Sequence, residues 1–284
     1  MSIPNLFSVA SKTVLITGGS RGIGLMLATG YAEAGAKTII SSRTEDDLNK
    51  AVETIKETVL SKTGSEPHVD TVVANVSTRH GCESLATAIS TLLPPGASGS
   101  PRLDILVNNA GSAWGEPLDR VSGKANWGWD RVLDLNVKGP FYLTRACLPY
   151  LTSGLGPVKG RVINIGSVVG LMPQDAPTHA YDASKAALHH LTKKMAGDLA
   201  PSGVTVNAVA PGFVPSRMSK GLESYATFEE IAASTPMGRL GNGEDMFGAA
   251  CYLSSRAGEW VTGVVLNVDG GAVGAAKIKL GDEE

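Results

Sequence analysis

Short apolar runs rich in β-branched residues alternate along this chain with longer amphipathic segments. The first run spans residues 13–17, and six more span residues 37–42, 69–73, 103–108, 161–165, 204–209 and 264–268. Between them, helical periodicity covers residues 22–34, 45–60, 82–92, a long stretch ending near Leu151, and residues 183–199. Strands separated by helices require parallel crossovers. The sequence therefore predicts an α/β fold, a doubly wound sheet of seven parallel strands with helices on both faces.

The size and charge of the chain limit its organisation and its partners. It has 284 residues, of which 43% are hydrophobic, and this is enough to bury one large core. We therefore expect a single domain over residues 1–284. The formal net charge is −2, and no long Lys/Arg cluster indicates a nucleic acid or an anionic membrane as partner. A small-molecule partner is the better expectation.

Cysteines, histidines and the chain ends give no sign of a metal site or of export. Cys82, Cys147 and Cys251 are far apart and match no metal-ligand spacing, which favours free thiols in a reducing compartment. His189 and His190 point about 100° apart on a helix and are poorly placed to hold one metal ion together. The N-terminus lacks the pattern of a secretion signal, and no stretch approaches the roughly 18 apolar residues of a membrane span. The cytosol is the default expectation.

Two segments interrupt the alternation of strands and helices. Residues 94–101 (PPGASGSP) are the low-complexity stretch and are interpreted as a surface loop. Residues 211–241 contain prolines, methionines and two short helical pieces, which is typical of a segment that covers a substrate. Trp114, Trp127 and Trp129 bracket a further loop, where they either pack or form the wall of a substrate pocket.

A glycine-rich turn, TGGSRGIG at residues 17–24, follows the first predicted strand and opens the first predicted helix. Glycines let the backbone approach a pyrophosphate, and the helix N-terminus offers unpaired N–H groups to the anion. The spacing differs from the general G-x-G-x-x-G fingerprint, and a glycine turn alone can serve tight packing only. Its position favours a cofactor site, with contacts from Gly18, Ser20, Arg21, Gly22, Ile23 and Gly24.

The end of the second predicted strand distinguishes between the two nicotinamide cofactors. An acidic residue there would bind the ribose 2′-hydroxyl of NAD(H) and repel the 2′-phosphate of NADP(H). This strand instead ends in Ser42 and Arg43, and no carboxylate occurs before Glu45. Arg43 can pair with a phosphate and Arg21 offers a second cation, so we expect NADP(H).

A second group of polar residues lies downstream. Ser167 follows the fifth predicted strand, and Tyr181 and Lys185 share one face of the next helix. We expect the Lys185 ammonium to lower the pKa of the Tyr181 phenol, which would allow Tyr181 to exchange a proton near neutral pH. Ser167 would donate to a substrate oxygen as negative charge develops there. Because Y-x-x-x-K alone is common on exposed helices, this prediction depends on the order of the motifs along the chain.

In that order, the motifs resemble the short-chain dehydrogenase/reductase family over nearly the whole chain. The resemblance extends to residues 108–111 (NNAG), 136–137 (NV) and 211–212 (PG). It implies a Rossmann-type sheet and, usually, a homotetramer. The catalytic set that it implies is Asn136, Ser167, Tyr181 and Lys185.

The resemblance also implies roles around the cofactor. Asn136 would hold the water that relays protons to Lys185, and Asn109 would lie beside the cofactor ribose. Asn75 replaces the usual acid of a pair that contacts adenine, and Ser216 stands where threonine is more usual. Beyond the glycine turn and the second strand, the cofactor contacts that the resemblance implies are Asn75, Val76, Asn109, Gly111, Tyr181, Lys185, Val214 and Ser216.

Within the family, residues 108–115, 162–170, 211–218 and 236–239 look most like 3-oxoacyl-carrier-protein reductases of the rhamnolipid-pathway type. This resemblance implies exchange between a ketone and a secondary alcohol, with a 3-oxoacyl thioester as one substrate. Because no basic face for an acyl carrier is evident, a reductase of other ketones, including those of secondary metabolism, stays open. A nucleotide-binding scaffold without catalysis is a third alternative, and the presence of Ser167, Tyr181 and Lys185 argues against it.

Overall fold

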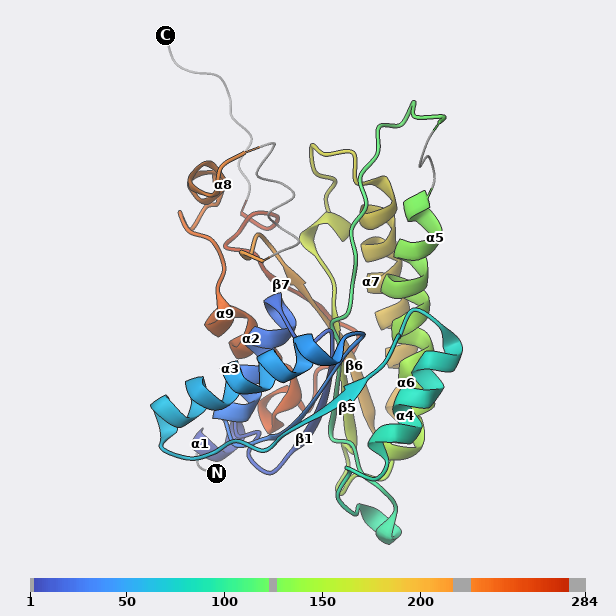
Figure 1. The fold of residues 1–284 in the computed structure, drawn as a ribbon, viewed down its shortest axis with the longest axis vertical. Helices are drawn as coiled ribbons and strands as arrows, with labels where there is room; N and C mark the ends of the chain where they lie inside the picture. The colour runs from blue at the N-terminus through green and yellow to red at the C-terminus, as the bar shows by residue number, and fades with distance from the viewer. Residues whose placement is uncertain (1–2, 123–126, 217–225, 276–284) are drawn as a thin grey trace.

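The computed structural model of the chain describes residues 3–122, 127–216 and 226–275 and contains one seven-stranded parallel sheet (Figure 1). The strand order is β3-β2-β1-β4-β5-β6-β7, and every neighbouring pair is parallel. This confirms the predicted fold class. The strands are β1 (Thr13–Thr17), β2 (Lys37–Ser42), β3 (Val69–Val73), β4 (Ile105–Asn108), β5 (Gly160–Ile165), β6 (Val204–Pro211) and β7 (Val265–Val268).

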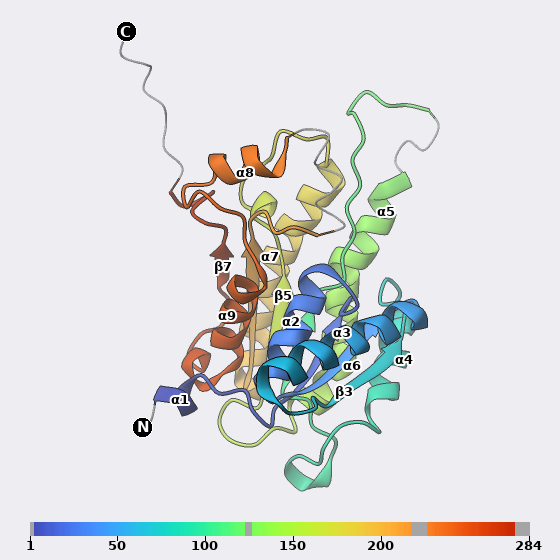
Figure 2. The same ribbon diagram turned by 60° about the vertical axis from the view of Figure 1, so that its left-hand side comes forward.

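Helices cover both faces of the sheet, as the two ribbon views show together (Figures 1 and 2). One face carries α2 (Gly22–Glu33), α3 (Glu45–Thr63) and α9 (Gly243–Ser254), which share one apolar core with the sheet. The other face carries α4 (Arg79–Ile89), α6 (Gly139–Leu151) and α7 (His179–Leu199), which share the second core. The shorter helices are α1 (Ile3–Leu6), α5 (Trp127–Leu133) and α8 (Phe228–Ser234). None of the helices in the described ranges is long and apolar enough to cross a bilayer.

The sequence-based elements agree with the structure except at a few ends and at two helices, the single turn α1 and the longer α9. β4 begins at Ile105 rather than at residue 103, and α4 begins three residues earlier than predicted because Thr78 caps it. Helix α9 was not predicted. Its start carries a readable capping box, in which Asn242 accepts from the N–H of Asp245 and the Asp245 carboxylate accepts from the N–H of Asn242.

Several smaller expectations can be compared directly with the structure. Residues 94–101 form an exposed loop with a short 3₁₀ turn, Ala97–Gly99, as predicted. The three cysteines are free thiols, also as predicted. Of the two short helical pieces expected in residues 211–241, α8 is one, while residues 217–225 lie outside the described part of the chain.

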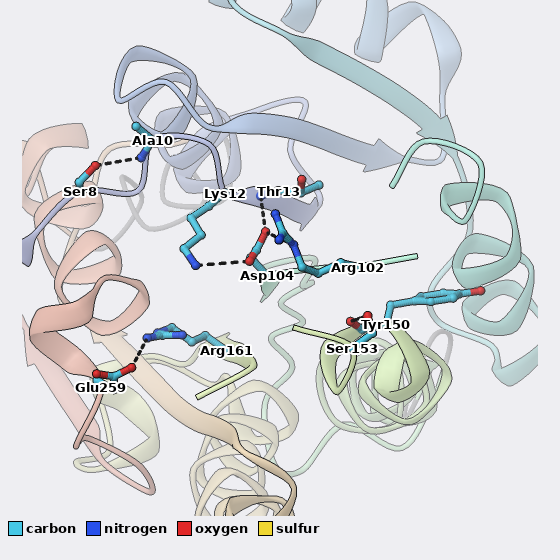
Figure 3. A network of polar contacts seen from close by, with 10 residues as sticks. All are labelled: Ser8, Ala10, Lys12, Thr13, Arg102, Asp104, Tyr150, Ser153, Arg161 and Glu259. Carbon is cyan, nitrogen blue, oxygen red and sulfur yellow. Dashed lines mark hydrogen bonds and ion pairs between the residues drawn. The ribbon is translucent and has the colours of Figure 1, made fainter. Parts of the chain in front are cut away.

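A polar cluster ties the strands together at their N-terminal ends (Figure 3). The Asp104 side chain is only 6% exposed, accepts from the N–H of Thr13 over 2.9 Å, and lies 3.4 Å from both Lys12 and Arg102. The backbone N–H of Arg161 donates to the carbonyl of Asp104 over 2.9 Å. The Asp104 carboxylate thus joins the starts of β1 and β4, and its backbone carbonyl joins β4 to β5. The opposite end of the sheet is left for the functional site.

That opposite end contains a topological switch point. β1 is flanked by β2 on one side and β4 on the other, so the chain winds outward through β2 and β3 and then returns to start the other half. The crevice beyond the C-terminal ends of the strands at such a point is where ligands bind in open α/β sheets. Helices α5 and α8 stand above this end (Figure 2).

Candidate active site

The glycine turn after β1 is held by backbone and side-chain bonds. Gly18 has a φ of 64°, a left-handed conformation that favours glycine, and its N–H donates to Ser41 O over 2.7 Å. A methyl group on Gly24 would lie 2.2 Å from Gly18 O, so α2 meets the turn at a distance that only glycine allows. The turn therefore leaves the helix N-terminus close to the open end of the sheet.

Asn109 stabilises this turn from β4. Its Nδ2 donates to Thr17 O over 2.9 Å and to Gly18 O over 3.1 Å, while its own N–H donates to Thr17 Oγ1. Asn109, which we predicted beside the cofactor ribose, thus uses both N–H groups of its side-chain amide to bond the turn. Its contact with the ribose remains a prediction.

The start of α2 fits an anion. Its N-cap residue, Arg21, is extended and makes no side-chain capping bond, so the first N–H groups of the helix are not used by a cap. Gly22 has a φ of 53°, and a methyl group there would lie 3.4 Å from Ser216 Cβ. The glycine turn after β1 and the segment after β6, which leave different halves of the sheet, therefore lie next to each other.

The adenosine-side residues lie at the C-terminal ends of β2 and β3. Arg21 and Arg43 are exposed, and neither guanidinium makes an ion pair within the described ranges. Ser42 Oγ donates to Thr44 O over 3.1 Å, which shapes the chain as it leaves β2. Asn75 is exposed and accepts two bonds from Ser77, whereas Val76 is buried. Two cations without partners, together with the glycine turn, fit a phosphorylated dinucleotide.

The remaining predicted cofactor contacts vary in their accessibility. Ser20 and Ile23 are half-buried in the turn, and Ile23 packs against the core under α2. The Val214 side chain is buried in the same core, which leaves its backbone groups for the predicted contact with the nicotinamide. These contacts stay predictions.

Asn136 lies in a π-helical turn, Asp134–Lys138, between α5 and α6. Such turns often occur at functional sites, because the extra residue turns side chains away from the regular helical ladder. Asn136 is 1% exposed; its Oδ1 accepts from the N–H of Ser112 and its Nδ2 donates to Ser112 O, each over 2.9 Å. Its Nδ2 also donates to Ser184 Oγ over 3.0 Å. Asn136 therefore joins the loop after β4 to helix α7.

Lys185 reaches the same place from α7. Its Nζ donates to Ile165 O at the end of β5 over 2.7 Å. A methyl group on Gly111 would lie 3.4 Å from Asn136 Oδ1 and 3.8 Å from Lys185 Nζ, so these three residues converge. Burial lowers the pKa of Lys185 to about 8 because the charged ammonium is removed from water.

Tyr181 and Ser167 complete the set. Burial raises the pKa of Tyr181, a hydrogen bond with Ser167 opposes that effect, and the charge of Asp182 adds to it. The expectation that Lys185 lowers this pKa is not met in this structure, because the Lys185 Nζ bonds to a carbonyl and lies 5.5 Å over the Tyr181 ring. The Tyr181 hydroxyl is consequently protonated at neutral pH.

A buried chain of amides and hydroxyls supports the site from below. Asn108 Nδ2 donates to Thr144 Oγ1 over 3.2 Å and to Asn164 Oδ1 over 2.9 Å. Asn164 Nδ2 then donates to Thr192 Oγ1 over 2.9 Å. Because all four side chains are buried and bonded, this chain sets the relative positions of α6, β4, β5 and α7.

Sequence reasoning missed two side chains next to the catalytic set. Ser184 accepts from Asn136 and donates to Tyr181 O over 2.7 Å, and its place between Tyr181 and Lys185 was a visible clue. His189 is 4% exposed and accepts from the N–H of Ser167. Its spacing of four residues from Lys185 placed it on the same face of the helix but did not reveal this contact.

Of the three tryptophans, Trp114 packs against α5, because a methyl group on Gly128 would overlap its ring.

Comparisons with known proteins agree with this geometry. A family model described as short chain dehydrogenase matches residues 12–226. The rhamnolipids biosynthesis 3-oxoacyl-[acyl-carrier-protein] reductase of Pseudomonas aeruginosa is 40% identical over 93% of this chain and 97% of its own length. The gluconate 5-dehydrogenase of Gluconobacter oxydans is 35% identical over 95% of this chain and 98% of its own length.

Solved structures extend the comparison to the fold. The RhlG/NADP active-site complex of Pseudomonas aeruginosa superposes with a TM-score of 0.83 at 38% identity, covering 94% of this chain and 98% of that one. A gluconate 5-dehydrogenase from Burkholderia cenocepacia in complex with NADP and tartrate gives a TM-score of 0.82 at 30% identity, covering 96% and 99%. Both hold NADP, the cofactor expected from Arg21 and Arg43. The chain belongs to the short-chain dehydrogenase/reductase family of oxidoreductases.

Proposed function

We propose that this protein uses NADP(H) to interconvert a ketone and a secondary alcohol. The observation that carries the proposal is the convergence of Asn136, Lys185 and Gly111 beside the Ser167–Tyr181 pair, at the same end of the sheet as the glycine turn. A non-catalytic scaffold would have no need to keep a buried lysine and a buried asparagine there, because each costs free energy to bury.

Different residues bind the cofactor, hold the proton and bond the substrate oxygen in the proposed reaction. The glycine turn, Arg21 and Arg43 would hold NADPH, which would supply the hydride. Tyr181 holds the proton for the substrate oxygen, and its raised pKa keeps it protonated at neutral pH. Ser167 bonds to Tyr181 and supplies a second hydrogen-bond donor as the oxygen gains negative charge.

Lys185 and Asn136 act around Tyr181. The Lys185 ammonium is buried beside the Tyr181 ring, and its Nζ bonds to Ile165 O. It would have to move from that carbonyl toward the Tyr181 oxygen to stabilise the negative charge left there once the proton has gone. Asn136 holds the Ser112 backbone against α7, which fixes the wall of the site on the β4 side. The water relay that the family resemblance implies for Asn136 is part of this proposal.

We propose an apolar ketone, with a 3-oxoacyl thioester as the first candidate. Leu171 and Met172, four and five residues after Ser167, are each 45% exposed, and Met237 is 65% exposed on the segment after α8. Exposed apolar side chains on segments that leave the C-terminal ends of β5 and β6 suit an acyl chain better than a polyol. The relative named as a 3-oxoacyl reductase supports this choice, and a general or secondary-metabolite ketone reductase is the alternative.

The test follows cofactor absorbance with NADPH or NADH and three kinds of substrate: 3-oxoacyl thioesters of increasing chain length, simple cyclic ketones, and 5-ketogluconate. We expect turnover with NADPH, with kcat/KM rising with acyl length as more apolar surface is buried. Preference for 5-ketogluconate would overturn the substrate assignment and leave the reaction class in place. Binding of NADPH without turnover of any substrate would favour the scaffold.

Three further expectations belong to the same proposal. The chain forms a homotetramer, it resides in the cytosol, and residues 211–241, within the single domain of residues 1–284, cover the bound substrate. Light scattering tests the tetramer. Slower proteolysis within residues 211–241 after addition of NADPH and substrate would support the covering role.

A further inference from the structure

His189 lies one helical turn beyond Lys185 on α7, directly beneath the turn that carries Ser167. Its side chain is 4% exposed, and its Nε2 accepts from the backbone N–H of Ser167 over 3.5 Å. Its Nδ1 has no hydrogen-bond partner among the described residues, and the ring packs against Gly170. The ring therefore contacts both ends of the turn formed by residues 167–170.

The glycines on either side of that turn make room for the imidazole. A methyl group on Gly166 would lie 2.2 Å from His189 Nε2, and one on Gly170 would lie 2.9 Å from His189 Cε1. The turn also packs against the helix itself, since the same methyl group on Gly170 would lie 2.7 Å from the backbone carbonyl carbon of Lys185. The backbone that carries Ser167 is thus seated on the His189 ring and on the turn of α7 that carries Lys185.

The imidazole is neutral in this position. Burial lowers the pKa of His189 to about 4, the charge of Lys185 lowers it further, and the nearby backbone of Gly170 works in the opposite direction. Because Nε2 accepts a bond, a neutral ring carries its proton on Nδ1. His189 therefore stays an acceptor for the Ser167 N–H throughout the range in which Tyr181 works.

We propose that His189 is a positioning residue for catalysis, which holds Ser167 in place through the backbone of residues 167–170. The Ser167 hydroxyl has to meet both Tyr181 and the substrate oxygen, and its direction follows from the backbone that His189 holds. This inference rests on the proposed ketone reduction for its kinetic consequences. The contact itself does not depend on the substrate.

The first test measures the contact without any substrate. Deuterium uptake by residues 166–172 is compared in wild type, His189→Leu, which has no acceptor, and His189→Gln, which retains one. His190→Leu is the control, because His190 is exposed on the same helix. We expect faster uptake in His189→Leu and partial recovery in His189→Gln. Equal uptake in wild type and His189→Leu overturns the proposal, even if the wild-type protein reduces no ketone.

The second test uses turnover in a double-mutant cycle. His189→Leu should lower kcat by about 10- to 100-fold with little change in the KM for NADPH, because misplacement of a catalytic group by 1 Å can cost about two orders of magnitude. His189→Gln should recover part of this loss. In a Ser167→Ala background the same His189→Leu change should have almost no further effect, since its action passes through Ser167. An equal fold-loss in both backgrounds would mean that His189 acts independently of Ser167.

Discussion

At the scale of single residues, the proposed reaction takes its proton from the Tyr181 hydroxyl. Tyr181→Phe removes that hydroxyl and hardly changes the volume of the side chain. We expect kcat to fall by at least about 100-fold, the usual contribution of a general acid, while NADPH still binds. Stopped-flow turnover and fluorescence titration with NADPH measure the two effects. Tyr142→Phe, at a half-buried tyrosine on α6, is the control and should keep the wild-type kcat. A wild-type kcat in Tyr181→Phe would contradict the mechanism.

Cofactor choice is also decided by single residues. Arg43 is exposed, has no described ion-pair partner, and follows a strand end without a carboxylate. Arg43→Asp should lower the ratio of kcat/KM for NADPH over NADH by about 10- to 100-fold, because a hydrogen bond to a charged group is worth about 1.5 to 3 kcal/mol. Lys50→Asp on the exposed side of α3 makes the same change in charge and should leave the ratio unaltered.

At the scale of elements, the Asp104 cluster joins the starts of β1, β4 and β5 at the end of the sheet that lies away from the site (Figure 3). Asp104→Asn leaves the cations of Lys12 and Arg102 without their carboxylate. We expect the free energy of unfolding to fall by about 1.5 to 3 kcal/mol, because the buried side chain loses its hydrogen bonds to charged groups while the two partly exposed cations keep some contact with water.

Urea denaturation measures this loss, and kcat at 25 °C should be unchanged because the cluster is remote from Ser167 and Tyr181. Glu66→Gln provides the matched control. It removes the exposed Lys56–Glu66 pair, and the denaturation midpoint should stay at its wild-type value. A large loss of activity in folded Asp104→Asn would mean that the two ends of the sheet are coupled.

At the scale of the whole molecule, the buried Lys185 makes stability depend on pH. Its pKa falls from 10.5 to about 8 on folding. Between these values the unfolded chain binds more protons than the folded one, so the free energy of unfolding rises with pH through this window. Below pH 8 the protein bears the full cost of burying the ammonium, about 3 kcal/mol.

Lys185→Met should therefore be more stable than wild type at pH 7, by up to about 3 kcal/mol, and the difference should shrink as the pH approaches 10.5. Taking the difference between the two proteins cancels other groups, such as Cys82, whose pKa burial raises to about 12. Urea denaturation without cofactor at several pH values provides the measurement. A difference that does not depend on pH would show that Lys185 has an ordinary pKa in the folded protein.

The sequence by itself determined the elements and their order. β-Branched runs and helical periodicity are local properties, so the first three strands were predicted with their observed bounds. The exceptions are the single turn α1 and helix α9, whose capping box at Asn242 was not used in the prediction. The motifs, through their resemblance to the family, placed Ser167 after β5 and Tyr181 and Lys185 near the start of α7.

Only the tertiary structure decided what these residues contact. Sequence spacing puts Lys185 on the face of Tyr181, but packing sends its Nζ to Ile165 O, and burial raises the Tyr181 pKa that we expected to fall. The partners Asn136 with Ser112 and His189 with Ser167 are 24 and 22 residues apart, and they meet across elements. Local patterns report propensity and periodicity, whereas burial and contacts between distant segments depend on how the whole sheet and its helices pack.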